Sequence, residues 1–528
     1  MSTSDSGDVL VRVPLQHAVP ERQFVRFKRI ILVNPPSPPG YVANRDSMGG
    51  FGQLFPSGAP VFPALDFAYL ASYLWDKRFR IDVIESQGLD LTTDQLVARI
   101  TDIACEDPAP QILVVARISA PSLDWDLSIL TEIKAAVPGI AAAVYGPVVP
   151  HVLHRLREEP CLDYLIQGEP DETVVELANG LPEEGILGLS YRSRESWMSS
   201  PARPFLKELD QLPFPKWELL PYRRYTLPKS STTAALPFLP MITSRGCPYG
   251  CHYCPYPVAQ GLPWRYRSPQ NVVDEIEHLV NDLGIRYILF RDPMFSMKQS
   301  RVREICGEIL RRRLALKWKC ETRPDCLDEE TVKAMAAAGC DGINFGVESV
   351  EVEIQSGVGR KPIPKERIIE MTALCRRHGI KTFCFFIIGL PGDTRHTILN
   401  TVEFAVRLRS NWVQFTAATP FIGTKLREWA VGQGLVTASE YAYVNSHEAT
   451  VGNGSLSKQE VEALHRFAKF FERYLINRFG ILKDDNRRDA VYRLAHQAAD
   501  WVTAAVARAA FAMGRRWLER TASPLRGT

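Results

Sequence analysis

Three cysteines in one short segment are the residues of this chain best suited to chemistry. Cys247, Cys251 and Cys254 are spaced C-x3-C-x2-C and directly follow the apolar run 236–242. Glycines at positions 246 and 250 let the backbone turn tightly, so three thiolates can converge on one small object. The spacing fits neither a paired C-x2-C zinc ribbon nor a C2H2 finger. A 4Fe–4S cluster normally takes four cysteines, so three local ones would leave one iron open to a ligand that is not protein.

This motif follows an expected strand and carries an aromatic residue, Tyr253, between its last two cysteines. In these features it resembles the signature of radical S-adenosylmethionine (SAM) enzymes. The resemblance implies that the amino and carboxylate groups of SAM bind the fourth iron. It also implies that the reduced cluster cleaves SAM to a 5′-deoxyadenosyl radical. Surface cysteines or a structural zinc site are the alternatives for the motif taken alone.

The composition is that of an ordinary globular protein of several domains: 528 residues, 45% apolar, 23% charged and a net charge of +3. No basic stripe points to nucleic acid as a partner. The first eight residues lack the plan of a signal peptide, and no run of 18 apolar residues predicts a transmembrane segment. Eleven scattered cysteines favour a reducing compartment, so we expect a cytoplasmic protein.

After a polar tail (1–26), strand and helix patterns alternate over residues 27–184. This alternation predicts an open, doubly wound (Rossmann-like) α/β sheet. A long Gly- and Pro-rich stretch, 48–63, interrupts it and is a candidate binding loop. The expected strands are 29–34, 80–85, 111–116, 140–145 and 164–166.

Ligands of such sheets bind beyond the carboxyl ends of the strands. The domain resembles the cobalamin-binding domain that precedes the barrel in one radical SAM subfamily. A plain doubly wound domain, or one that binds a nucleotide, is the alternative, although no G-x-G-x-x-G follows the first strand. The resemblance implies that cobalamin contacts Pro36, Arg117, Ser119, Gly146, Pro147, Gly168 and Glu169.

No histidine lies in a D-x-H-x-x-G motif, so an imidazole from that motif is not the lower ligand of a bound cobalt. Arg117 then becomes a candidate neighbour of the lower face, because a cation cannot ligate cobalt. A surface or phosphate-binding arginine is the alternative.

Residues 185–235, rich in Pro, Ser and Arg, are expected to form a linker. From 236 to 426 a second series of six strand–helix repeats predicts a partial (β/α)6, TIM-like barrel with its chemistry at the carboxyl ends of the strands. Residues 427–528 are expected to be helical, with amphipathic helices at 457–479 and 489–519.

The polar residues after the barrel strands match the order found in radical SAM enzymes. The resemblance implies that Glu348 and Ser349 bind the ribose or methionine end of SAM, and that Arg323 lies near its carboxylate or the substrate. Backbone at Tyr253 would lie near adenine. The remaining implied SAM contacts are Gly346, Gly389, Pro391 and Pro420.

Asp292 also follows a barrel strand. Cys326, in a loop, is a candidate additional catalytic cysteine, as in one branch of radical methylases. The simplest interpretation of Cys320, Cys340 and Cys384 is that they are core residues. No residue is assigned as catalytic.

The resemblance covers residues 27–426 and implies a cobalamin-dependent radical SAM methyltransferase acting on a carbon centre of a small biosynthetic intermediate. One alternative keeps both cofactors but performs cyclisation, rearrangement or oxidation. Another is a non-catalytic iron–sulfur or zinc-binding protein. The expected partners are a small-molecule substrate and a flavodoxin- or ferredoxin-like electron donor, and the expected state is a monomer.

Overall fold

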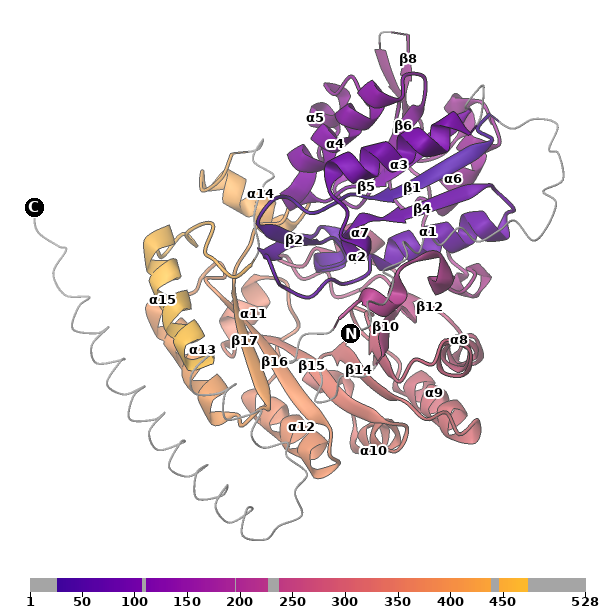
Figure 1. The fold of residues 1–528 in the computed structure, drawn as a ribbon. Coiled ribbons are helices and arrows are strands. Elements are labelled where there is room, and N and C mark those ends of the chain that lie inside the picture. The colour runs from indigo at the N-terminus through magenta and orange to yellow at the C-terminus, as the bar shows by residue number, and fades with distance from the viewer. Residues whose placement is uncertain (1–25, 107–110, 195, 227–236, 438–445, 473–528) are drawn as a thin grey trace, which may run out of the picture. The chain divides into compact units, whose positions relative to one another are not determined.

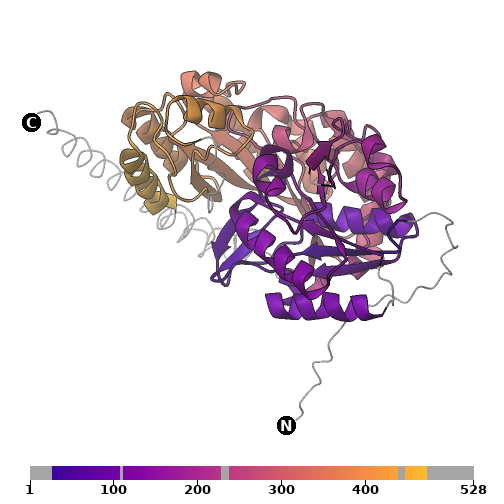
Figure 2. The same ribbon diagram turned by 90° about the horizontal axis from the view of Figure 1, so that it is seen from above.

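The structure, a computed structural model, describes residues 26–106, 111–194, 196–226, 237–437 and 446–472. The chain forms two compact units, which we call the N-terminal unit (residues up to 227, with 258–260) and the barrel unit (the remaining described residues). Figures 1 and 2 show both, and each is described by itself below.

The N-terminal unit is built on one seven-stranded sheet with the order β4-β1-β5-β6-β7-β8-β9. The first five strands are parallel and the last two join antiparallel. All six residues of β1 are buried, as expected of a strand covered on both faces. The strands are β4 (Ile81–Glu85), β1 (Arg29–Asn34), β5 (Ile112–Arg117), β6 (Ala141–Tyr145), β7 (Tyr164–Ile166), β8 (Leu189–Ser193) and β9 (Ser196–Ser199).

Helices cover both faces of this sheet (Figure 1): α1 packs with α6, and α3 packs with α4. This confirms the predicted doubly wound fold. Its strand order places a change of winding direction between β1 and β5, where ligands of such folds bind. The helices are α1 (Leu65–Asp76), α2 (Ser86–Leu89), α3 (Thr93–Cys105), α4 (Leu123–Ala136), α5 (Leu153–Arg157) and α6 (Asp171–Ala178).

Two hairpins were not predicted. Strand β3 (Gln53–Pro56) lies in the stretch 48–63 that was expected to be a binding loop, and it pairs with β2 (Tyr41–Asn44) just before that stretch. Strands β8 and β9 lie in the expected linker. All four strands are short and half of their residues or more are not buried, so they lack the apolar alternation that reveals a strand.

The barrel unit has six parallel strands in sequence order, β10-β13-β14-β15-β16-β17, which confirms the predicted partial barrel. Strands β10 and β17 do not pair, so the sheet stays open. The strands are β10 (Phe238–Met241), β13 (Tyr287–Phe290), β14 (Lys317–Thr322), β15 (Cys340–Glu348), β16 (Lys381–Ile388) and β17 (Trp412–Ala417).

Helices α10, α12, α13 and α15 pack on the outer face of this sheet. A capping box formed by Ser457 and Glu460 starts α15, which packs on β16 and β17 as one more barrel helix. The end of the helix expected at 457–479, and the helix expected at 489–519, lie outside the described residues. The helices are α8 (Pro269–Asn281), α9 (Gln299–Arg311), α10 (Glu329–Ala337), α11 (Val352–Gly357), α12 (Lys365–Arg377), α13 (Arg395–Arg407), α14 (Lys425–Gly432) and α15 (Lys458–Phe471). The short helix α7 (Tyr256–Gln260) follows the cysteines, and its last three residues are the 258–260 segment assigned to the N-terminal unit.

No helix within the described parts of the chain combines the length and apolar character needed to cross a membrane.

Candidate active site

The loop that carries the three cysteines follows β10 and a short strand, β11 (Ser244–Arg245), which pairs with β12 (Arg265–Tyr266). The Cys247 N–H donates to the carbonyl of Gly261 at 3.1 Å, and the Cys254 N–H donates to the carbonyl of Cys251 at 3.0 Å. Gly246 has φ +84°, and a Cβ there would lie 2.2 Å from the carbonyl oxygen of Pro263. A side chain at position 246 would therefore push the cysteine loop out of place.

Asp292, which the sequence placed at a strand end, anchors the start of this loop. Its buried carboxylate accepts hydrogen bonds from the Thr243 N–H (2.7 Å), the Thr243 hydroxyl (2.5 Å) and the Ser244 hydroxyl (2.6 Å). Asp292 therefore positions the loop rather than facing a ligand.

The three thiols are free and lie near one another. Burial raises the pKa of Cys247 and of Cys254, and the neighbouring thiol of Cys251 raises both further. No group of three or more His, Cys, Asp or Glu side chains in the described residues is arranged to hold a single metal ion. The three neighbouring thiols would supply three of the four cysteine ligands that a 4Fe–4S cluster normally takes.

Arg323 follows β14 and is almost completely buried. Its guanidinium pairs with both oxygens of Asp325 (2.9 and 3.0 Å) and lies 4.5 Å from the centre of the Tyr249 ring in the cysteine loop. It also donates to the carbonyl of Lys361 at 2.8 Å, yet its Nη1 is buried without a partner. A buried donor without a partner is a place where a ligand carboxylate can bind.

Glu348 ends β15 at an irregularity in the pairing with β16, and its φ is +69°. Its carboxylate lies 3.8 Å from Nη1 of Arg360 and has no hydrogen bond to any described residue. Burial raises the pKa of Glu348, while Arg360 and Arg323 act in the opposite direction. A half-buried carboxylate without hydrogen bonds suits the hydroxyl or ammonium groups of a ligand.

Arg360 joins Glu348 to the cysteine loop. Its Nη1 donates to the Tyr253 hydroxyl at 3.1 Å, its Nη2 donates to the Gly346 carbonyl at 2.6 Å, and its Nε is buried without a partner. Sequence reasoning missed Arg360 and Tyr249, because a lone arginine after a short helix and a tyrosine inside a motif give no signal of their own.

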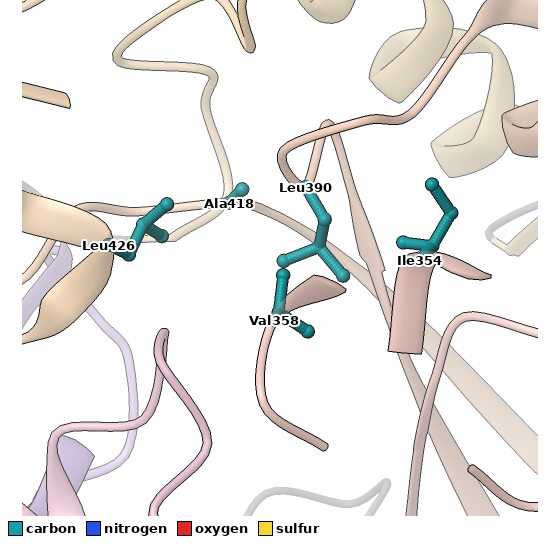
Figure 3. Close-up of a cluster of buried hydrophobic side chains, with 5 residues drawn as sticks. All are labelled: Ile354, Val358, Leu390, Ala418 and Leu426. Atoms are coloured by element: carbon teal, nitrogen blue, oxygen red, sulfur yellow. The ribbon is translucent and has the colours of Figure 1, made fainter. Parts of the chain in front are cut away.

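An apolar cluster supports the loops that follow the last three strands (Figure 3). The half-buried Tyr253 and Ile387 pack against it. The cluster therefore connects the cysteine loop with the strand ends where adenine was expected. Its members are Ile354, Val358, Leu390, Ala418 and Leu426.

The side chains of Asp393 and Asn453 hold the loop 389–393 in place, and we call it the clamped loop. Asp393 accepts from the N–H groups of Gly389 (3.2 Å) and Leu390 (3.0 Å). The Asn453 side chain donates to the carbonyls of Leu390 (3.1 Å) and Asp393 (2.9 Å). Asn453 lies before α15, in a region where no site residue was predicted.

The sequence-predicted residues are thus only partly brought together. The structure brings the three cysteines together with four of the predicted SAM contacts, either through direct contacts or through the effect of their charges on one another. These four residues are Tyr253, Arg323, Gly346 and Glu348. Gly389 and Pro391 belong to the clamped loop, and Pro420 is buried after β17. Ser349 is buried and its hydroxyl accepts from the N–H of Glu351 at 3.3 Å. Cys326 lies 3.3 Å from the Tyr249 hydroxyl.

In the N-terminal unit, Arg117 is fully buried and its guanidinium is occupied by protein groups. It pairs with Asp66 at 2.9 Å, donates to the carbonyls of Arg45 and Gly50 at 2.8 Å each, and also donates to the carbonyl of Ile118. Arg117 therefore fastens the β2–β3 hairpin to the end of β5 rather than lying on the surface.

Other strand-end residues are also tied into the protein. The N–H of Ser119 donates to Asp126 at 3.2 Å, Pro36 accepts from Trp125 at 3.1 Å, and Glu169 accepts from the N–H of Leu206 at 2.8 Å. A Cβ at Gly146 would lie 2.5 Å from the carbonyl oxygen of Ile118. Pro147 packs close to Gly50.

Two features of these strand ends still suit a bound cofactor. The hydroxyl of Tyr145, the last residue of β6, is buried without a partner. Gly168, after β7, has φ +83° and no atom within 4 Å of the position of a Cβ. A buried hydroxyl that lacks a partner and an open stretch of backbone at the carboxyl edge fit a ligand that carries amide groups.

Comparison with known proteins agrees with this geometry. The model of the Radical SAM superfamily matches residues 241–405. An uncharacterized methyltransferase of Pyrococcus horikoshii is 30% identical over 414 residues, which cover 77% of this chain and 86% of that protein. An anaerobic magnesium-protoporphyrin IX monomethyl ester cyclase of Rubrivivax gelatinosus is 25% identical over 378 residues, covering 67% of this chain and 64% of the cyclase.

Among solved structures, TsrM of Kitasatospora setae, a radical SAM methyltransferase with cobalamin and a 4Fe–4S cluster bound, has the same fold. The TM-score is 0.61 at 23% identity, over 77% of this chain and 78% of that one.

A doubly wound domain followed by an open six-stranded barrel with a C-x3-C-x2-C loop defines a class of two-domain radical enzymes. The chain belongs to the radical SAM superfamily and to the family of the Pyrococcus horikoshii methyltransferase, as the cysteine motif predicted. The non-catalytic alternative is therefore not supported.

Proposed function

We propose that the protein is a cobalamin-dependent radical SAM methyltransferase that transfers a methyl group to a carbon centre of a small molecule. The observation that carries the proposal is the set of buried groups without partners around the cysteine loop, in a chain 30% identical to a methyltransferase along most of its length. When bound, the cluster and SAM supply a 5′-deoxyadenosyl radical, and cobalamin supplies the methyl group.

The barrel residues have distinct roles in this proposal. Cys247, Cys251 and Cys254 hold three irons. The free Nη1 of Arg323 binds the SAM carboxylate, and Glu348 accepts hydrogen bonds from the SAM ammonium or ribose. Arg360 keeps the Glu348 carboxylate charged and correctly oriented, because its guanidinium is itself fixed by Tyr253 and Gly346.

The clamped loop that contains Gly389 and Pro391, together with Pro420, lines the adenine and keeps water away from the radical. In the N-terminal unit, the ends of β1, β5, β6 and β7 line cobalamin, with Tyr145 and the backbone at Gly168 as its polar contacts. Pro36, Ser119, Gly146, Pro147 and Glu169 shape that edge, while Arg117 positions the hairpin beside it.

We further propose that the protein works as a monomer in the reducing cytoplasm, with a flavodoxin- or ferredoxin-like electron donor. All eleven cysteines are free thiols, which agrees with such a compartment.

Anaerobic reconstitution tests the proposal. The wild type should bind about four irons per chain and, with a strong reductant, form 5′-deoxyadenosine from SAM. The variant with Cys247, Cys251 and Cys254 all changed to Ala should do neither. A full cluster in that variant, or zinc as the only metal of the wild type, would contradict the assignment of a 4Fe–4S cluster to these cysteines.

Radical cyclisation or oxidation is a second candidate, because a cyclase is among the relatives. With its substrate, a methyltransferase should form S-adenosylhomocysteine and 5′-deoxyadenosine in equal amounts and a product heavier by one methyl group. 5′-Deoxyadenosine without S-adenosylhomocysteine would favour the second candidate.

A further inference from the structure

The inner face of the barrel sheet differs from its outer face. On the outer side of β14, Trp318 is fully buried and donates to the carbonyl of Ala338 at 2.8 Å. The next residue, Lys319, points to the opposite, inner face, where its side chain lies against Gly342 of β15. In a closed barrel, side chains fill this interior. Here several inner-face side chains stay only half-buried: Phe385, Ile387, Gln414 and Thr416.

Lys319 is a buried cation without an anionic partner. Only 4% of the residue is exposed. Its Nζ lies 3.2 Å from the centre of the Phe383 ring and makes no hydrogen bond or ion pair with any described residue. Burial lowers the pKa of Lys319 to about 7, opposed by Glu321, Asp341 and Cys320 and reinforced by Lys381. Burying a charged ammonium away from water is unfavourable unless an anion pairs with it.

The neighbours of Lys319 do not supply that anion. Glu321, two residues along β14, is occupied by Arg291 (3.1 Å) and by the Asn344 amide N–H (3.3 Å). Asp341, which also acts on Lys319, accepts from the Tyr287 hydroxyl at 2.9 Å. The charges of Glu321 and Asp341 are balanced by those of Arg291 and Lys381, so one positive charge remains, on Lys319. The carbonyl oxygen of the Asn344 side chain is also buried without a partner. Asn344 pairs with Phe383 across the sheet, so both unfilled groups adjoin the same aromatic ring.

We propose that Lys319 and Asn344 form a substrate subsite on the inner face of the barrel that binds the carboxylate of an otherwise apolar substrate. One ammonium balances one negative charge, which favours a carboxylate over a phosphate dianion. The Asn344 carbonyl accepts from an N–H or O–H beside that carboxylate, and the half-buried Phe385 and Ile387 contact the apolar body. The proposal rests on the proposed function and names its substrate class.

Lysine carbamylation by cyanate tests the subsite in the reconstituted full-length protein. At pH 7 Lys319 should react at least about 10-fold faster than the exposed, paired Lys333, because more of its amine is unprotonated. Acetate should slow the Lys319 reaction by about 10-fold, since an anion at the amine raises its pKa by a unit or more. Peptide mass spectrometry measures both rates.

Each contrary result overturns the proposal. An unreactive Lys319 beside a reactive Lys333 would mean that the inner face is closed. Equal rates with and without acetate would mean that no anion site exists, and protection by inorganic phosphate alone would point to phosphorylated substrates. The reaction needs neither reductant nor SAM, so its failure is separate from failure of the proposed function, which would appear as absent 5′-deoxyadenosine.

A variant separates binding from structure. Lys319→Met keeps the length of the side chain but removes the charge, so the protein without substrate should unfold at the same or a higher temperature. A clearly lower unfolding temperature would show that Lys319 supports the fold instead of a ligand.

Discussion

Glu348 combines two properties that ordinary core residues avoid. Its backbone has a positive φ, and its half-buried carboxylate has no hydrogen bond, with Arg360 at 3.8 Å as its one ion pair among the described residues. Strained residues with unfilled polar groups concentrate at binding sites, where a ligand completes them. Glu348 is therefore the single residue whose change should most directly report SAM binding.

Replacing Glu348 by Gln should raise the SAM concentration needed for half-maximal 5′-deoxyadenosine formation. The expected factor is about 10- to 100-fold, since a hydrogen bond to a charged group contributes about 1.5–3 kcal/mol. Glu351→Gln is the matched control, because Glu351 pairs with Lys365 (3.4 Å) and Asn400 (3.2 Å). Equal SAM dependence in both variants would mean that Glu348 does not touch the cofactor.

Tyr145→Phe tests the cobalamin edge of the N-terminal unit. Removing a buried hydroxyl without a partner should leave the cofactor-free protein as stable as before or up to about 1 kcal/mol more stable. The same change should weaken hydroxocobalamin binding, measured by absorbance titration. Tyr73→Phe, which removes a hydroxyl hydrogen-bonded to Glu172, should instead lower stability and leave binding intact. Unaltered binding in Tyr145→Phe would contradict the proposed contact.

Among the elements, the segment before α15 stabilises a loop that is distant in sequence, because Asn453 donates two hydrogen bonds to the loop 389–393. Asn453→Ala should cost about 1–3 kcal/mol of stability, because it removes two buried hydrogen bonds and leaves the Asp393 carbonyl without this donor, whereas the Leu390 carbonyl still accepts from the Asp393 N–H at 2.9 Å. It should also raise the SAM requirement. Asn411→Ala is the control: it loses one bond, to the Thr382 N–H (3.1 Å), at the other end of the strands. Only Asn453→Ala should change SAM dependence, and an effect of both variants would indicate a general loss of stability.

The sequence predicted these elements where one physical signal dominated. Strands β1 and β7 were placed to the residue, because apolar runs and the turn residues that follow them agree there. The β2–β3 and β8–β9 hairpins were missed because their polar, exposed residues carry no such pattern.

In the site, the cysteines and strand-end glycines could be proposed from sequence because their spacing is local. Arg360, Tyr249, Lys319 and Asn453 were missed because each acquires its role only through contacts made by folding. The boundaries proposed for the domains stay predictions.

The whole molecule consists of two units, each with its own sheet and buried ion pair. In the N-terminal unit Arg45 pairs with Asp126 at 2.5 Å, and in the barrel unit Arg267 pairs with Glu275 at 2.5 Å. All four side chains are almost completely buried. Breaking either pair leaves an uncompensated buried charge, which costs about 3–5 kcal/mol.

Calorimetry of Arg45→Ala and Arg267→Ala should therefore show two transitions, with a different one lowered in each variant. Loss of the cluster cysteines should affect the same transition as Arg267→Ala. A single transition that shifts equally in both variants would mean that the two units unfold as one.

The positive φ at Glu348 should lower the thermal stability of the protein, although the residue is needed for SAM binding. Glycine adopts this backbone conformation without the roughly 1–2 kcal/mol that it costs other residues, and asparagine tolerates it better than glutamate. Both would also remove a half-buried carboxylate that accepts no hydrogen bond from the described residues. If variants of this protein were selected only for resistance to unfolding on heating, glycine or asparagine should become common at position 348. The selected variants should be more stable but should bind SAM poorly.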